Sequence, residues 1–195
     1  YTRMMVVALF RMSFKSGMRP GEIRQLKWTD VKVTDHFSKK RRKFIRLMRV
    51  SVRAATSKVR KSRIFLYKDD DNLPTWKSRV RLLWDDESEQ DKFVFSLDGK
   101  EEPSKRTILY HFGRLLDLAG INREGRDIVP YSFRHYYITE RIMSGLGYHE
   151  VAAMCGTSAG EVEETYYHLN DQTRLTHALA GYELDDDGLV VPVDE

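Results

Sequence analysis

Residues 131–168 read YSFRHYYITERIMSGLGYHEVAAMCGTSAGEVEETYYH, and this stretch decides the fold. It begins with Arg134 between aromatic residues and a histidine, crosses a glycine-rich turn at residues 144–147, and ends in two adjacent tyrosines followed by His168. Apolar residues recur at helical spacing before and after the turn, so we expect helices over residues 132–144, 148–154 and 159–167. Folding these helices back on one another brings a cation and a phenol to one place.

A cation beside a phenol suits chemistry on a phosphodiester. A phosphodiester repels anionic nucleophiles, so an enzyme that attacks it needs fixed positive charge on the non-bridging oxygens, best supplied by forked arginine donors. Tyrosine has a reference pKa of about 10 and is a poor nucleophile until such charge lowers the barrier, but it can form a covalent intermediate. One arginine is seldom enough, so we expect a second one elsewhere in the chain.

The stretch resembles the tyrosine recombinases, which are the phage integrase family. Their second arginine box reads roughly His-x-x-Arg-His, and their nucleophile lies in a Tyr-x-His ending that follows a Gly-His-Ser turn. Here Arg134 and Tyr166 are 32 positions apart and Thr157 and Tyr166 are nine apart, both as in the family. The Tyr-x-His ending favours Tyr166 over Tyr167 as the nucleophile. Two residues depart from the pattern, because Tyr131 and Thr157 stand where histidine, or at the second place histidine or tryptophan, is usual.

A second part of the family pattern lies near the start of the chain. The segment SGMRPGEIRQLKWTDV, residues 16–31, resembles the family's first arginine box, Thr-Gly-Leu-Arg-x-x-Glu-Leu followed by Leu-x-Trp-x-Asp. Pro20 suits the first turn of a helix and pushes Arg19 toward an extended conformation, so we expect this guanidinium at a helix entrance. By the resemblance, Arg19 is the first phosphate-clamping arginine and Glu22 is a carboxylate that buttresses the site.

Strand patterns occupy residues 30–67. Apolar and polar residues alternate at 31–33 and 44–52, and a further apolar run lies at 63–67, which predicts a small antiparallel sheet. Between the last two strands lies ATSKVRKS, residues 55–62. In the resembling family a lysine in a β-turn at this place enters the DNA minor groove and acts as general acid toward the leaving 5′-hydroxyl. Lys58 is our choice for this role and Lys61 is the second choice.

These patterns together predict an α+β fold, a mostly helical catalytic domain with a small antiparallel three-stranded sheet, over residues 1–182, with an acidic tail at 183–195. The expected catalytic residues are Arg19, Lys58, Tyr131, Arg134, Thr157 and Tyr166. Residues expected to support them are Glu22, His135 and His168. Residues expected to bind DNA are Lys39, Lys40, Arg41, Arg42, Arg60, Lys61, Lys105 and Arg106.

Charge is distributed unevenly along the 195 residues. Residues 39–63 contain twelve Lys or Arg and no acid, whereas residues 183–195 contain six acids and no base. This polarity indicates a polyanion-binding face. The single cysteine, Cys155, excludes an internal disulfide framework and is expected to be a buried apolar residue. Because no apolar run approaches the roughly 20 residues that span a bilayer, we expect a cytoplasmic, DNA-associated protein and no membrane partner.

The resemblance implies a site-specific DNA recombinase, an integrase of a phage or other mobile element, that cleaves and rejoins strands through a 3′-phosphotyrosyl intermediate. It implies no cofactor and no metal. The implied partners are double-stranded DNA, further copies of the chain in a tetrameric synapse, and accessory DNA-bending proteins. We expect an N-terminal DNA-binding domain outside this chain, and we expect the tail either to dock on a neighbouring subunit or to be disordered.

Two alternatives remain open. Type IB topoisomerases share the chemistry and the core of the fold, although the first arginine box and the compact tyrosine segment favour the recombinases. A catalytically degenerate DNA-binding protein draws support from the two missing histidines at Tyr131 and Thr157.

Overall fold

The computed structural model describes residues 1–40, 42–57, 60–68, 72–84 and 91–166, and the backbone of residues 181–184 and 190–193. Arg41, Lys58 and His168 lie outside the described residues. The elements in chain order are α1 (Thr2–Ser16), α2 (Pro20–Arg24), η1 (Trp28–Asp30), β1 (Val31–Ser38), β2 (Lys43–Val52), η2 (Ala54–Thr56), β3 (Arg63–Lys68), α3 (Asn72–Val80), η3 (Arg81–Leu83), α4 (Lys105–Leu118), α5 (Ser132–Met143), α6 (Tyr148–Cys155), α7 (Ala159–Tyr166), β4 (Gly181–Leu184) and β5 (Val190–Val193).

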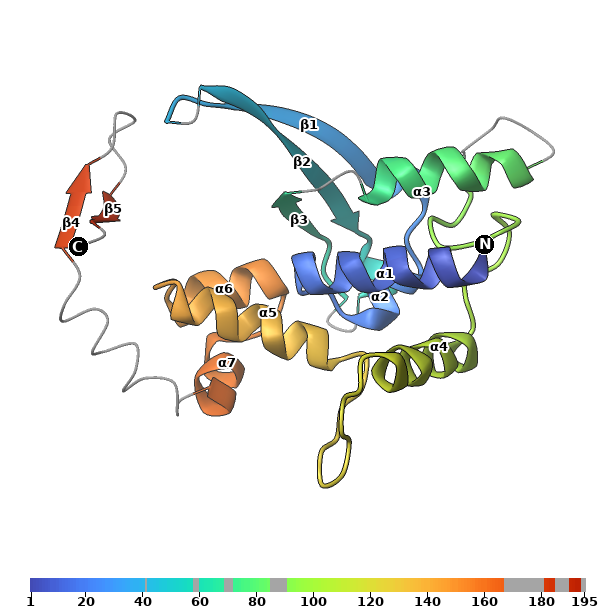
Figure 1. The fold of residues 1–195 in the computed structure, drawn as a ribbon. Helices are drawn as coiled ribbons and strands as arrows, with labels where there is room; N and C mark the ends of the chain where they lie inside the picture. The colour runs from blue at the N-terminus through green and yellow to red at the C-terminus, as the bar shows by residue number, and fades with distance from the viewer. Residues whose placement is uncertain are drawn as a thin grey trace.

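Helix α1 lies at the centre of the fold (Figure 1). It buries Met5, Leu9 and Met12, which are three and four residues apart and therefore share one face. Helices α3, α4 and α5 all contact α1. Gly17 ends the helix in the left-handed region at φ 63°, and a Cβ at this position would collide with the ring of Tyr137 on α5. Glycine at residue 17 therefore allows α1 to end directly against α5.

The predicted antiparallel sheet is present, with strand order β1-β2-β3. Alternate residues of β2 face the core, where Met48, Val50 and Val52 are buried. The sequence pattern indicated only a short first strand, but β1 runs on to Ser38 because it pairs with β2 as far as Ser38↔Lys43. The result is a hairpin of β1 and β2 that projects beyond the helices (Figure 1). The predicted α+β class with a three-stranded antiparallel sheet is confirmed.

Buried apolar side chains form two clusters. The first cluster joins α1, the sheet, α3 and α4. The second joins α5, α6 and α7, and it includes Tyr166. Aromatic contacts join α1 to α5, since the rings of Phe10 and Phe133 lie 5.5 Å apart and those of Phe14 and Tyr136 stack at 4.8 Å. The candidate site lies along the seam between these clusters, as the contacts below show.

Within the acidic tail, β4 and β5 pair as antiparallel strands, with Leu184 opposite Val190. The sequence pattern did not predict these strands, because four acidic residues between positions 183 and 187 obscure the short apolar run that follows. None of the helices in the described ranges combines the length and apolar character needed to cross a membrane.

Candidate active site

Arg19 stands at the entrance to α2, as Pro20 predicts. Its backbone is extended, at φ −66° and ψ 137°, and it occupies the N-cap position. Its Nη1 donates to the carbonyl oxygen of Gly156 at 2.9 Å and lies 3.4 Å from Oε1 of Glu22. Gly156 is 137 positions away in the chain, so this contact joins the first arginine box to the segment that carries the tyrosine.

Arg134 occupies the first turn of α5 and is only 2% exposed. Its Nη1 donates to the carbonyl oxygens of Gly17 and Cys155, each at 2.8 Å. Gly17 follows α1 and Cys155 ends α6, so Arg134 bridges the two apolar clusters.

The two guanidinium groups therefore bind adjacent carbonyls, Cys155 O for Arg134 and Gly156 O for Arg19. Carbonyls at the C-terminal end of a helix lack intrahelical partners and carry partial negative charge, which explains why two cations gather there. Among the described residues, these carbonyl bonds use Nη1 of each side chain. Forked guanidinium donors are the groups that suit a phosphate, and these carbonyl bonds leave Nη2 and Nε of each arginine unused.

Tyr166 ends α7 and is 6% exposed, and its hydroxyl lies 2.6 Å from Nδ1 of His135. Burial raises the pKa of Tyr166 to about 12, although the charge of Arg134 acts in the opposite direction. Partial desolvation, and after it the charge of Arg134, lowers the pKa of His135. Both shifts favour the neutral forms, and in the tautomer with its hydrogen on Nε2 the imidazole Nδ1 accepts the phenolic hydrogen. The candidate nucleophile thus has a proton acceptor already in contact.

The two residues at the usual histidine positions make different contacts. The ring of Tyr131 lies 5.1 Å from the ring of His135 and 6.0 Å from Cζ of Arg134, so it lies beside the site. Thr157 directs its hydroxyl to the carboxylate of Glu161 on α7. The structure therefore brings Tyr131 against the arginine and histidine, while the Thr157 hydroxyl bonds to the first turn of the following helix, α7.

Sequence reasoning missed Arg63, the first residue of β3. Its Nη2 donates to Oε1 of Glu22, which also contacts Arg19, and its Nη1 donates to Oγ of Ser57 at 2.8 Å. Glu22 is buried, at 2% exposure, and so needs these cationic partners. Ser57 directly precedes the candidate general acid Lys58 in the sequence. Arg63 thus ties the first arginine box to the loop that carries the lysine.

The packing of Arg63 against Gly156 yields a testable prediction. Gly156 has φ 65°, and a Cβ there would collide with the guanidinium of Arg63. Gly120 has φ 64° with no atom within 4 Å of an added Cβ, so it is a matched control. We expect Gly120→Ala to lower the free energy of unfolding by about 1 kcal/mol and Gly156→Ala by at least about 2 kcal/mol more, measured by urea unfolding.

A double-mutant cycle shows whether Arg63 is the cause. The extra loss in Gly156→Ala should shrink when Arg63 is also changed to alanine, because the collision is then removed. Equal losses in the two glycine variants would contradict the proposed contact.

The basic residues expected to bind DNA lie in three exposed places. Arg60 and Lys61 are in the loop before β3, next to Arg63. The far end of the β1–β2 hairpin holds Lys39, Lys40 and Arg42, and the first turn of α4 holds Lys105 and Arg106. The first group adjoins Arg63 in the sequence, and the other two groups lie on separate elements, the projecting hairpin and α4 (Figure 1).

Comparison with known proteins places the chain in a family. A sequence model of the phage integrase family matches residues 2–173. No curated protein matches the sequence. The fold is similar to that of the XerH site-specific recombinase bound to palindromic difH substrate in a post-cleavage complex, with a TM-score of 0.66 and 17% identity over 89% of this chain and 45% of that one.

Two further solved structures agree. XerH bound to difH in a pre-cleavage complex gives a TM-score of 0.66 and 20% identity over 90% of this chain and 46% of that one. The XerA recombinase gives 0.61 and 22% over 90% and 55%. This chain therefore spans about half the length of these recombinases. Because the family pattern extends over residues 2–173 and the fold agrees, the chain belongs to the phage integrase family and has the tyrosine recombinase catalytic fold.

Proposed function

We propose that this chain is the catalytic part of a site-specific DNA recombinase that breaks and rejoins strands through a phosphotyrosyl bond. The observation that carries the proposal is the meeting of two arginines from distant segments on adjacent carbonyls, Cys155 O and Gly156 O, beside a tyrosine bonded to a histidine. The family supports it, as do structural neighbours that are recombinases bound to a DNA substrate.

The reaction exchanges one phosphodiester for another and needs no external energy source. The Tyr166 oxygen attacks phosphorus and forms a 3′-phosphotyrosyl bond, while the bond from phosphorus to the 5′-oxygen breaks. The phenolic proton passes to Nδ1 of His135, which already contacts the hydroxyl. Lys58, or second Lys61, supplies a proton to the leaving 5′-oxygen. A 5′-hydroxyl from a partner strand then reverses the same steps.

Arg19 and Arg134 provide the electrostatic part of the proposed catalysis. The pentacoordinate transition state carries more charge on its non-bridging oxygens than the ground state does, and fixed guanidinium groups stabilise that difference. Glu22 and Arg63 keep Arg19 in place through their ion pairs. Tyr131 borders the same space and can donate a hydrogen bond to the phosphate.

The arrangement described here is a closed one. Tyr166 is 6% exposed and Arg134 only 2%, so a phosphate reaches them only after the segments that cover both side chains shift, with the Tyr166–His135 contact kept. Burial keeps the phenol neutral until that movement. We infer that DNA binding supplies the free energy for the movement.

The wider biological setting follows from the family and extends the proposal. We propose double-stranded DNA as the substrate, a tetramer of the whole protein as the active assembly, and DNA-bending proteins as accessory factors. The proposed source is a phage or other mobile element, and the proposed location is the cytoplasm, in association with DNA. The tail at residues 183–195 is proposed to dock on a neighbouring subunit, and an N-terminal DNA-binding domain is proposed to close around the DNA.

A covalent-adduct assay tests the function. Nicked duplexes of randomised sequence trap the intermediate, because the short strand released after cleavage diffuses away and cannot reverse the reaction. We expect a protein–DNA adduct in buffer containing EDTA, and sequencing of the trapped DNA would reveal the site. Relaxation of supercoils without strand exchange would favour a topoisomerase, and no adduct at any protein concentration would favour a DNA-binding protein without catalysis.

The contact between His135 and Tyr166 predicts a pH dependence. The folded pKa of His135 lies below its ordinary value of 6.5, so the imidazole is neutral and able to accept a proton above that value and becomes protonated only below it. Adduct formation in single turnover should therefore slow as the pH falls below about 6.5. His135→Phe should form the adduct about 100-fold more slowly at pH 7.5, and its rate should not show this further fall at acid pH, which is called the acid limb below. His149→Phe, an exposed histidine on α6, is the control and should keep the limb. An unchanged limb in His135→Phe would contradict the role.

A further inference from the structure

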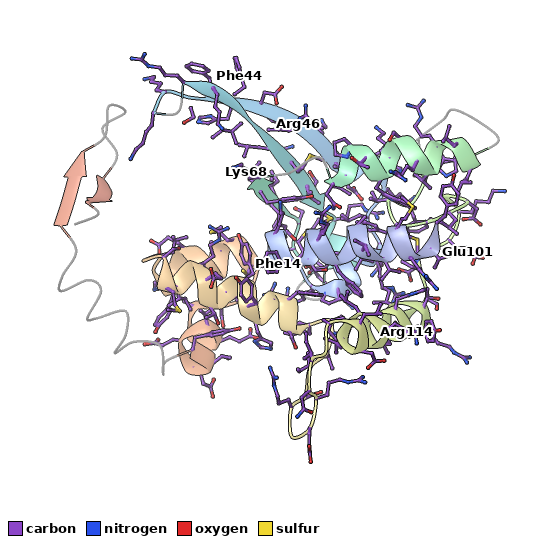
Figure 2. All side chains as sticks on the ribbon, in the orientation of Figure 1. Phe14, Phe44, Arg46, Lys68, Glu101 and Arg114 are labelled. Atoms are coloured by element: carbon purple, nitrogen blue, oxygen red, sulfur yellow. The ribbon has the colours of Figure 1, made fainter. Side chains whose placement is uncertain are left out.

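The β1–β2 hairpin, defined here as residues 31–52, concentrates the positive charge of the chain. It contains eight Lys or Arg and a single acid, Asp35, so its charge exceeds the +4 of the whole chain. Arg42, Lys43 and Arg46 are exposed on it, as are Lys39 and Lys40. In Figure 2 the labelled Arg46 and Phe44 lie on the projecting part, with Phe44 farther from the helices. A protruding basic ribbon is an electrostatic match for a polyanion.

The end of the hairpin also carries an aromatic pair. Phe37 and Phe44 are directly opposite in the strand register, and their ring centroids lie 5.1 Å apart at 61°. They belong to the same side of the ribbon as Met48 and Val50, which are buried in the core. Beyond the core this side is uncovered, so Phe37 is 49% exposed and Phe44 is 70% exposed.

An edge contact between two rings stabilises the hairpin itself. This stabilising role does not explain why both rings leave so much apolar surface exposed to water, or why cationic side chains surround them. Aromatic rings interleaved with Lys and Arg combine the two contacts that nucleic acids offer, base surface and phosphate. This combination distinguishes the hairpin end from the other exposed apolar residues, such as Leu82 on η3.

The length of the hairpin fits the geometry of a duplex. Strand β2 has ten residues, which at about 3.3 Å per residue span about 30 Å. One turn of B-form DNA measures about 34 Å. The inner end of β2 is Val52, which pairs with Arg63, and Phe44 lies eight residues before it, so the aromatic pair lies about 26 Å along the strand from Arg63, a little under one helical turn. A two-stranded ribbon also has the width that the major groove admits.

We propose that the β1–β2 hairpin is a second DNA-binding element, which lies in a groove of duplex DNA about one helical turn from the scissile phosphate. Lys39, Lys40, Arg42 and Lys43 contact phosphates. The Phe37–Phe44 pair contacts the apolar surface of the bases, including thymine methyl groups. This inference rests on the proposed function for the position of the cleaved phosphate, and it adds an anchoring contact to it.

A photo-crosslinking experiment tests the contact directly. The photoreactive residue p-benzoylphenylalanine replaces Phe44 in the full chain, and in a control it replaces Leu82, which is 78% exposed on η3. The probe is a 40-base-pair duplex of mixed sequence. We expect a protein–DNA crosslink from position 44 and none from position 82. A crosslink from position 44 to a second protein chain, for example to the acidic residues 183–195, would overturn the inference, as would no crosslink there.

Salt titrations separate the two kinds of contact. Changing Lys39, Lys40, Arg42 and Lys43 to glutamine should reduce the slope of log affinity against log salt by about 3.5. The double variant Phe37→Ser with Phe44→Ser should weaken binding about tenfold and leave the slope unchanged. Unchanged affinity and slope in both variants would overturn the inference.

The adduct assay distinguishes failure of this inference from failure of the proposed function. If wild-type protein forms the tyrosine adduct but position 44 does not crosslink to DNA, only the hairpin inference falls. If position 44 crosslinks to DNA but no tyrosine adduct forms, the hairpin binds DNA and the recombinase proposal is wrong.

Discussion

We expect Tyr166→Phe to abolish the covalent DNA adduct, with strand cleavage lowered by at least about 10⁴-fold, and Tyr167→Phe to cleave at close to the wild-type rate. The expectation follows from chemistry, because phenylalanine has no oxygen to attack phosphorus and nothing in the site replaces it. The measurement is single-turnover adduct formation on the nicked duplex selected from the randomised pool. The effect should be the largest of any single substitution in the chain.

The variant separates chemistry from folding because Tyr166 also packs in the second apolar cluster. Phenylalanine keeps the ring and loses only the bond to Nδ1 of His135, so the urea midpoint should change little. DNA affinity should also stay near the wild-type value. An adduct that persists in Tyr166→Phe and disappears in Tyr167→Phe would show that the nucleophile has been assigned to the wrong tyrosine.

Arg134→Ala should have the second largest effect, with strand cleavage lowered by about 10³-fold and the protein destabilised as well. The loss of rate follows from removal of a fixed cation beside the reacting phosphate. The loss of stability follows from the carbonyls of Gly17 and Cys155, which would be left buried without a donor. We expect the free energy of unfolding to fall by about 3 kcal/mol.

Matched variants distinguish the loss of cleavage rate from the loss of stability. Arg134→Lys keeps the charge but lacks the planar, forked donors that match a phosphate, so it should recover less than a tenth of the lost rate. Arg141→Ala lies on the same helix, where the guanidinium sits 4.8 Å from the centre of the Tyr137 ring, and it should leave cleavage nearly unchanged. Rates are compared at a temperature where every variant is folded. If Arg134→Ala cleaved DNA at the wild-type rate under those conditions, the phosphate-clamping role would be wrong.

The sequence was most informative where side-chain chemistry and spacing coincide. Arg19, Arg134 and Tyr166 lie in three separate segments, yet each segment has a recognisable local pattern, and the structure brings all three together. The helix entrance at Arg19 could be expected because proline restricts the residue before it. The buried state of Cys155 could be expected because no neighbouring charge in the sequence activates it.

Arg63 could not be singled out from the sequence. It is the last of twelve basic residues between positions 39 and 63, and nothing local separates it from Arg60 or Lys61. Its importance arises from tertiary contacts with Glu22 and Gly156, which are distant along the chain. The available signal in the sequence was the basic run at residues 39–63, because a buried carboxylate such as Glu22 needs cationic partners and this run could supply one.

The contacts of side chains with backbone carbonyls also could not be predicted from the sequence. Arg19 and Arg134 both bind carbonyl oxygens at the C-terminal end of α6, and because every residue type has a carbonyl, the sequence does not mark these partners. The full length of β1 also escaped prediction, because exposed residues from Lys32 to Phe37 lack the alternation that marks a half-buried strand. Pairing with β2, and not burial, determines how far that strand extends.

The contact between His135 and Tyr166 bears on the missing histidines. The family pattern has histidines where Tyr131 and Thr157 stand here, which weakened the expectation of catalysis. The structure places His135 at 2.6 Å from the phenol, in a neutral form able to accept its proton. We therefore expect His135 to serve the first proton transfer without either of the usual histidines.

The most direct test of the central claim, that Arg19, Arg134 and Tyr166 form one phosphodiester-cleaving site, is mass spectrometry of the trapped adduct. After digestion with nuclease and protease, a nucleotide should remain on the peptide that contains Tyr166, linked through its 3′-phosphate, and this peptide should be absent from Arg19→Ala and Arg134→Ala. A nucleotide on another residue, or one linked through a 5′-phosphate, would contradict the account.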